Sequence, residues 1–192
     1  GDPASAPYRV ALGRGLAASG DVIGSVQQFR EAERLAPGHA HVLAGLGEAL
    51  LALGDRESAR EKLMLAVRGL PPQAETVRQF TEFSKRLAEW DVTLAAAEHW
   101  RDLAPSDVRA WLAIGEARGR RHELKAAMEA FDRAIALGAP AALYHATIAE
   151  LAEHAHELNV AAERATRAIA LDPNLDEAAV VLARVTRRQG DA

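Results

Sequence analysis

Four glutamates recur at a constant interval of 34 residues along this chain of 192 residues. They are Glu48, Glu82, Glu116 and Glu150. A residue type that recurs at one period occupies an equivalent place in each unit of a repeat array. The four carboxylates would then form an acidic ladder, which favours a basic or amphipathic peptide and speeds its encounter at low salt. Glutamate is also a good helix former, so a solvated helix surface would produce the same pattern.

A second charged group combines both signs within one short segment. Arg78 and Lys85 lie beside Glu75 and Glu82. The two cations would accept an acidic side chain of a partner. Alternatively, the group is a solvated helix face with internal i,i+4 pairing, as between Arg78 and Glu82.

The histidines do not form a recognisable metal site. The closest pairs are His39 with His41 and His154 with His156. Residues two apart do not share a helix face, the His-Glu-x-x-His motif is missing, and the chain has no cysteine for a thiolate zinc site. We also find no Ser-His-Asp order, paired carboxylate pocket or cofactor motif. We therefore expect a non-enzymatic protein with no catalytic residue, metal or cofactor.

Prolines mark the same period as the glutamates. Pro3, Pro37, Pro71, Pro105 and Pro173 are separated by 34, 34, 34 and 68 residues. The proline ring and its missing N–H prevent a helix from continuing, so each proline marks the end of a helical segment. A fixed period between 20 and 50 residues is the signature of a repeat array.

Each repeat is predicted to contain two helices. Apolar residues follow helical spacing, as at Phe29, Ala32 and Leu35. Gly20-Asp21 and Gly54-Asp55 fall near the middle of their units, where glycine can end one helix and aspartate can cap the next.

These features resemble the tetratricopeptide repeat (TPR) family, whose pattern runs Trp-x2-Leu-Gly-x2-Tyr, then Ala-x3-Phe, then Pro. The best local match is Trp111, Ile114, Gly115, Ala127, Phe131 and Ala134. The resemblance covers nearly the whole chain in five consecutive units. It implies an all-α fold, a right-handed superhelical solenoid of antiparallel helix pairs whose first helices line a concave groove.

The register divides the chain into seven segments. They are a tail of a preceding repeat or a linker at 1–5, repeats at 6–39, 40–73, 74–107, 108–141 and 142–175, and a partial sixth repeat or capping helix at 176–192. The third repeat is degenerate, because Thr81, Thr93 and Trp100 stand where small residues are usual and Ala97 where an aromatic residue is usual. Pro3 and Gly190-Asp191 fit the same register, which indicates a segment of a longer array.

The resemblance also assigns residues to the groove. It places the four glutamates on the groove wall, with Arg78 and Lys85 among them. It places Ala44, Leu112 and Ala146 on an apolar floor. Family members that grip a C-terminal carboxylate carry Lys and Asn where this chain has Val10 and Arg14, so we expect no such clamp.

Composition excludes several partners. The net charge of -4 and the pI near 6.0 argue against nucleic-acid binding, which usually requires a basic excess. No apolar run approaches the roughly 18–20 residues of a membrane span. Twenty arginines against three lysines are typical of a GC-rich bacterial genome. The sequence favours neither the cytoplasm nor the periplasm.

Together these features predict a protein–protein interaction scaffold or adaptor that binds a peptide or protein partner in its groove. Alternatively, the chain is a regulatory or substrate-presenting domain of a larger protein, either a bacterial envelope or exopolysaccharide-export assembly or a transferase. Self-association through the terminal repeats is a further possibility, because terminal repeats expose apolar surface.

Overall fold

The computed structural model describes residues 5–190, and within that range it contains only α-helices and the turns and loops that join them. The helices are α1 (Ala6–Ala18), α2 (Val22–Leu35), α3 (Ala40–Leu53), α4 (Arg56–Arg68), α5 (Ala74–Arg86), α6 (Trp90–Leu103), α7 (Val108–Arg120), α8 (Leu124–Ala136), α9 (Ala141–His154), α10 (Leu158–Leu171) and α11 (Asp176–Gly190). The chain divides into two compact units, Gly1–His99 and Trp100–Ala192, and the division falls within α6. Pro3 and Asp191, on which two predictions depend, lie outside the described residues.

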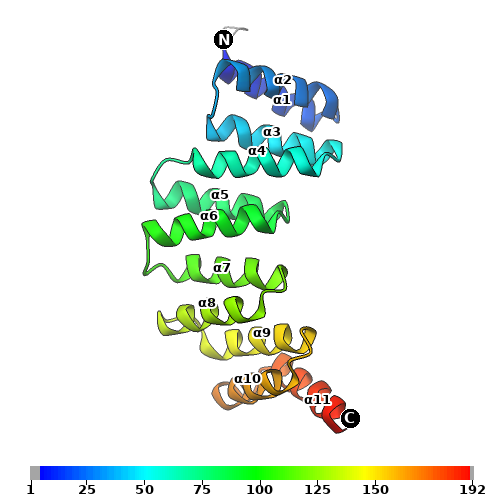
Figure 1. Cartoon of the computed structure of the whole chain (residues 1–192), viewed down its shortest axis with the longest axis vertical. Helices are drawn as coiled ribbons and strands as arrows, with labels where there is room; N and C mark the ends of the chain where they lie inside the picture. The colour runs from blue at the N-terminus through cyan, green and yellow to red at the C-terminus, as the bar shows by residue number, and fades with distance from the viewer. Residues whose placement is uncertain (1–4, 191–192) are drawn as a thin grey trace. The chain divides into compact units, whose positions relative to one another are not determined.

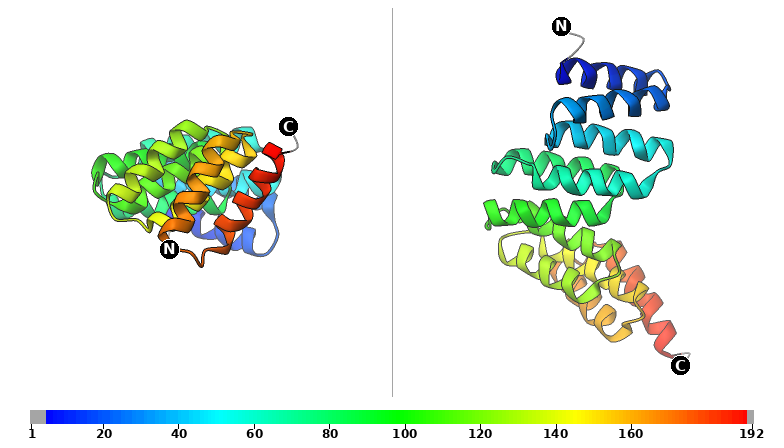
Figure 2. Two further views of the ribbon diagram at one scale, coloured as in Figure 1. Left: turned by 90° about the horizontal axis from the view of Figure 1, so that it is seen from below. Right: turned by 45° about the horizontal axis from the view of Figure 1, so that its top comes forward.

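In unit 1, consecutive helices pack side by side in chain order (Figure 1). Their connecting loops alternate between the two ends of the helices, so neighbours run antiparallel (Figure 2). The turns predicted at Gly20-Asp21 and Gly54-Asp55 are confirmed. Both glycines adopt positive φ, 88° and 91°, and the Asp21 and Asp55 carboxylates accept hydrogen bonds from the N–H groups of Gly24 and Ser58.

The core of unit 1 begins where α2 packs between α1 and α3. Phe29 of α2 is 2% exposed and lies in one cluster with Val42, Leu46 and Leu50 of α3. The Phe29 ring lies so close to the α3 backbone that a Cβ placed on Gly45 would stand 2.3 Å from ring atom Cε1. Burying a side chain of this size stabilises the fold by roughly 1.5–3 kcal/mol.

The degenerate third repeat uses buried hydroxyl groups where α5 meets α6. Thr81, Ser84 and Thr93 are fully buried. The Thr93 hydroxyl donates to Ser84 Oγ at 3.0 Å, and those of Thr81 and Ser84 donate to backbone carbonyls at 2.9 Å. Since every hydroxyl has a partner, the polar groups add little desolvation cost. Ala97 and Trp100, which exchange the usual large and small residues, are both buried.

Unit 2 has an alanine-rich core. Phe131 of α8 packs with Ala127 and Ile148, and a Cβ on Gly115 would stand 2.7 Å from the Phe131 ring. In α9 and α10, alanines allow close helix contact, and they pack with two valines of α11; the residues are Ala149, Ala152, Ala161, Ala165, Val181 and Val185. Thus both units depend on small residues at the helix contacts.

The all-α prediction is confirmed for the described residues. Each predicted 34-residue segment from 6 to 141 contains the starts and ends of two helices, except that α9 begins at Ala141, one residue before its segment. The division into repeats and the right-handed superhelical twist stay predictions.

Candidate functional site

The two predicted groove glutamates of unit 1 differ in their surroundings. Glu48 is exposed on α3 and has no ion-pair partner among residues 5–190. Glu82 is half-buried on α5, and its Oε2 lies 3.9 Å from the ammonium of Lys85. The charge of Glu82 is therefore partly balanced within its own helix, whereas the charge of Glu48 has no counter-charge among the described residues and could attract a basic group of a ligand.

Arg78, the other predicted cation, is held by its own helix. Its Nε donates to Oε2 of Glu75 at 2.8 Å, and Gln79 donates to the same carboxylate at 2.9 Å. Arg78 and Gln79 lie three and four residues after Glu75, the spacings at which helix side chains meet. A partner's acidic group would have to compete with Glu75 for this guanidinium, so the binding role of Arg78 and Lys85 stays a prediction.

In unit 2, Glu116 is half-buried on α7 and Glu150 is exposed on α9. Glu150 has no ion-pair partner within the part of the chain that the structure describes. One turn later, Glu153 is buried, and Nη2 of Arg184 in α11 lies 2.7 Å from its Oε2. Arg188 also contacts Glu153, at 3.4 Å. Of these neighbouring carboxylates on α9, Glu150 faces solvent and Glu153 ties α9 to α11.

The three predicted floor residues are attached to the core to different degrees. Ala44 is half-buried and packs against the cluster that contains Leu43. Leu112 packs against the cluster of Phe131, and Ala146 is 5% exposed and packs with Ala168 and Ala178. Only the outer surfaces of these side chains could meet a ligand, and the floor role stays a prediction.

A side-chain hydrogen bond between α1 and α3 was not predicted from the sequence. Nη2 of Arg14 donates to Nε2 of His41 across 2.7 Å, and both side chains are exposed. Partial burial, then the charges of Arg14 and His39, lower the pKa of His41, which favours the neutral imidazole that can accept this hydrogen bond. The available signal was that Arg14 occupies the position where the following repeats carry glutamate.

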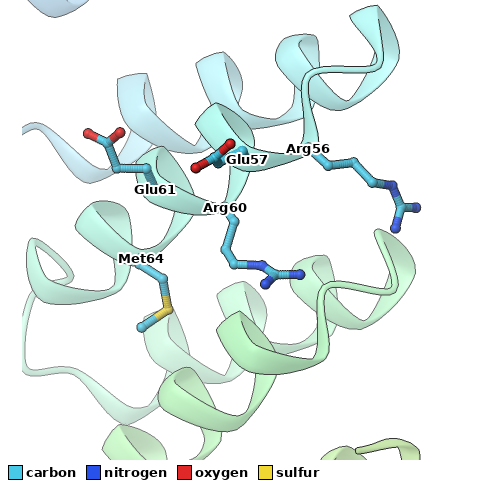
Figure 3. A pocket seen from close by; sticks show the side chains of 5 residues that line it. All are labelled: Arg56, Glu57, Arg60, Glu61 and Met64. Atoms are coloured by element: carbon cyan, nitrogen blue, oxygen red, sulfur yellow. The ribbon is translucent and has the colours of Figure 1, made fainter.

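The second helices present a different surface, a pocket of about 590 Å³ beside α4. All five lining side chains come from α4, namely Arg56, Glu57, Arg60, Glu61 and Met64 (Figure 3). Their spacing of three and four residues places them on neighbouring positions of one helix surface. The pocket is open and mixed in charge.

Arg60 connects this pocket to a buried acid. Its Nε lies 3.6 Å from Oε2 of Glu89, and its Nη1 lies 3.1 Å from the carboxylate of Asp91. Glu89 is 2% exposed, and its Oε1 has no hydrogen-bond partner. Arg60 therefore holds α4 to the start of α6, because its guanidinium contacts the carboxylates of both Glu89 and Asp91.

Residues 5–190 contain no cluster of histidine, aspartate or glutamate suited to a metal ion. Nor does any helix in this range have the length and apolarity to cross a membrane. The surfaces described above hold charged side chains on paired helices, an arrangement suited to binding.

Solved structures that resemble the chain include the following three. YrrB, described as a TPR protein with an unusual peptide-binding site, gives a TM-score of 0.57 at 15% identity over 92% of this chain and 91% of YrrB. MamA from Desulfovibrio magneticus RS-1 gives 0.55 at 21% identity, over 92% and 98%. A tetratricopeptide repeat protein from Parabacteroides merdae gives 0.60 at 14% identity, over 96% and 73%. No protein-family model and no curated protein matches the chain.

Antiparallel helix pairs with small residues at their contacts define the chain as an all-α helical repeat protein. More particularly, it has the tetratricopeptide repeat fold, as the resemblance of its sequence motifs predicted.

Proposed function

We propose that the chain is a protein–protein interaction scaffold that binds a peptide or protein partner through the surface of its first helices. The observation that carries this proposal is the pair of exposed, unpaired carboxylates at equivalent repeat positions, Glu48 in unit 1 and Glu150 in unit 2. Free carboxylates attract basic groups and cost the fold little when they remain solvated. The structurally similar YrrB, which is described as having a peptide-binding site, supports the same class of ligand.

The proposed partner is a basic or amphipathic peptide in an extended or helical conformation. Glu82 would add to the negative charge of unit 1, and Glu116 to that of unit 2. Ala44 in unit 1, and Leu112 and Ala146 in unit 2, would offer apolar contact beside the charges of their own unit. Nucleic acid is not a proposed partner, because a net charge of -4 would repel phosphates. Catalysis is not part of the proposal either.

A peptide-display selection with the whole chain tests this function. We expect selected peptides to be enriched in Lys and Arg, and their affinity to fall as salt rises. Glu48→Gln with Glu150→Gln should weaken binding and flatten the salt dependence. The matched control is Glu57→Gln with Glu61→Gln, which removes two exposed carboxylates from the second helix α4. Selected peptides without basic enrichment, or equal effects of both double variants, would contradict the proposal.

Two other proposals from the sequence stay open. A regulatory or substrate-presenting role in an envelope assembly or a transferase would be tested by the sequence that flanks this chain in its genome. Self-association would use apolar residues that are exposed on the terminal helices, Tyr8 and Leu12 of α1 and Val180 of α11. Sedimentation of Leu12→Glu against the unchanged chain would test it.

A further inference from the structure

We propose that α1 and α3 of unit 1 form a binding site for a peptide segment that carries an acidic side chain and, three residues away, a basic one. The acidic group would bind Arg14 and His41, and the basic group would bind Glu48. This inference rests on the proposed scaffold function and makes it specific, because it names the charges and spacing that the ligand must have.

The cationic end of the site is the contact between Arg14 and His41. The guanidinium donates one N–H to the imidazole at 2.7 Å. A neutral imidazole does not cancel the positive charge, and no carboxylate within residues 5–190 forms a hydrogen bond or ion pair with Arg14. Guanidinium has five N–H donors in a planar fork, so those not used by His41 can bind a carboxylate. The hydrogen bond to His41 also limits where the guanidinium can lie.

The anionic end is Glu48, seven residues after His41 on the same helix. Seven residues are nearly two turns, so both side chains leave the same face of α3, about 10 Å apart along its axis. Glu48 is exposed, and like Arg14 it has no partner of opposite charge in the described part of the chain. The site thus presents two unpaired charges of opposite sign at a fixed separation.

The surface between the two charges is small and partly apolar. Ala44 lies three residues after His41 and four before Glu48, so it shares their face of α3. It is half-buried against the core, which fixes its position. A methyl group here leaves room for a peptide backbone to approach the helix.

The spacing of the charges selects the ligand. A peptide in the polyproline II conformation, which unfolded peptides commonly adopt, has three residues per turn and advances about 3.1 Å per residue, so side chains three residues apart leave the same side about 9 Å apart. A peptide of the form acidic-x-x-basic therefore places one charge at each end of the site. A peptide with two like charges would place one of them beside a group of the same sign, and a phosphate chain would be repelled by Glu48.

The neighbouring repeat of unit 1 shows why the site belongs to α1 and α3. In α5, Glu75 is bound by Arg78 and Glu82 lies near Lys85, so the equivalent charges already have partners. A ligand gains less from charges that must first be separated from their partners. The uncompensated charges are those of Arg14 and Glu48.

The test uses the whole chain labelled with ¹⁵N and short synthetic peptides as probes. The matched probe is acetyl-Ala-Asp-Ala-Ala-Lys-Ala-amide. Two comparison probes carry Asn for Asp or Gln for Lys, and a fourth brings the charges one residue closer. We expect amide shifts in α1 and α3, and up to about fivefold weaker binding for each comparison probe, because an exposed charge pair contributes at most about 1 kcal/mol.

Charge reversal then identifies the residues. Arg14→Glu should transfer preference to a probe with two Lys, and Glu48→Lys to a probe with two Asp. Arg56→Glu and Glu57→Lys reverse exposed charges of α4 and are the controls. Both should leave the preference unchanged, and an unchanged amide spectrum elsewhere would show that each variant is folded.

The outcomes separate this inference from the scaffold function. If the matched probe shows no preference over the comparison probes, or if reversal at Arg14 and Glu48 acts no differently from reversal on α4, the inference is wrong. If display-selected peptides still bind the unchanged chain, the scaffold function survives that failure. If neither the probes nor any selected peptide binds, both are overturned.

Discussion

Gly47 offers the sharpest test of how the helix pairs of this array pack. A Cβ on Gly47 in α3 would stand 2.6 Å from Cγ and 2.7 Å from Cδ2 of Leu63 in α4, and 3.3 Å from the Ala59 carbonyl oxygen. Leu63 is fully buried, so it has no space into which to withdraw. We therefore expect Gly47→Ala to destabilise the protein, although alanine is the better helix former.

The magnitude follows from two opposing effects. Overpacking of this kind costs about 2–3 kcal/mol, and replacing a helical glycine with alanine returns about 1 kcal/mol. The net loss should be about 1–2 kcal/mol. In a Leu63→Ala background the two closest atoms are gone and only the Ala59 carbonyl oxygen at 3.3 Å remains close, so Gly47→Ala should instead stabilise by up to about 1 kcal/mol. The double-mutant cycle should thus give a coupling energy of about 2–3 kcal/mol.

Gly15 provides the control. It is exposed in α1, and a Cβ there meets nothing within 4 Å, so Gly15→Ala should stabilise by about 1 kcal/mol in either background. Urea denaturation followed by circular dichroism measures each variant, with hydrogen exchange over α3 and α4, because repeat arrays need not unfold in one step. If Gly47→Ala behaves like Gly15→Ala in the unchanged chain, the close approach of α3 and α4 inferred here would be refuted.

Three further predictions concern ion pairs between helices. In unit 2, Arg164 of α10 binds Asp132 of α8 and lies 3.2 Å from Nδ1 of His145. Arg164→Met should cost about 1–3 kcal/mol at pH 7. Because the hydrogen bond from Arg164 lowers the pKa of Asp132, this contribution is fully present above the unfolded-state pKa near 3.9 and is lost as pH falls through the folded value, so the urea midpoints of the variant and the unchanged chain should converge as pH is lowered. Arg60→Met leaves the buried Glu89 without its cation and should lower the free energy of unfolding by about 1–3 kcal/mol. The double variant Arg60→Met with Glu89→Met should recover most of this loss in thermal unfolding. An equal or larger loss of stability in the double variant would argue against the pairing. Arg184→Met should speed amide hydrogen exchange in α11, because Glu153 loses its closest partner. Arg187→Met changes an exposed residue of the same helix and should not speed it. Equal exchange rates in the two variants would show that Arg184 does not hold α11 to α9.

The helix pairs were predictable because the sequence repeats the features that end and cap helices. Gly20-Asp21 and Gly54-Asp55 predicted turns with a positive-φ glycine and an aspartate cap, and the structure has both. The TPR motif match includes both Gly115 and Phe131, and the structure brings these two residues into close contact. Each of these features acts over a few residues or at one repeat period, so the sequence displays it directly.

The partners of long charged side chains were not predictable in the same way. A repeat period specifies where the backbone of each residue lies, but arginine can reach several carboxylates from one backbone position. Arg184 binds Glu153, 31 residues earlier, and Arg14 contacts His41, 27 residues later. The burial of Glu89 was also missed, because its position is that of the turn aspartates Asp21 and Asp55 in the first two repeats, neither of which is buried.

In unit 1, the distribution of ion pairs separates stability from recognition. Lys62 of α4 lies 2.7 Å from Glu33 of α2, and Arg60 joins α4 to the start of α6, so charges on the second helices hold neighbouring repeats together. Arg14 and Glu48 on the first helices have no such partners in the described range. Solvated charges without partners add little to folding, so selection for stability alone would not require them. Changes at Arg14 and Glu48 should therefore alter ligand preference while leaving the unfolding free energy nearly constant, whereas changes at Lys62 or Arg60 should do the reverse.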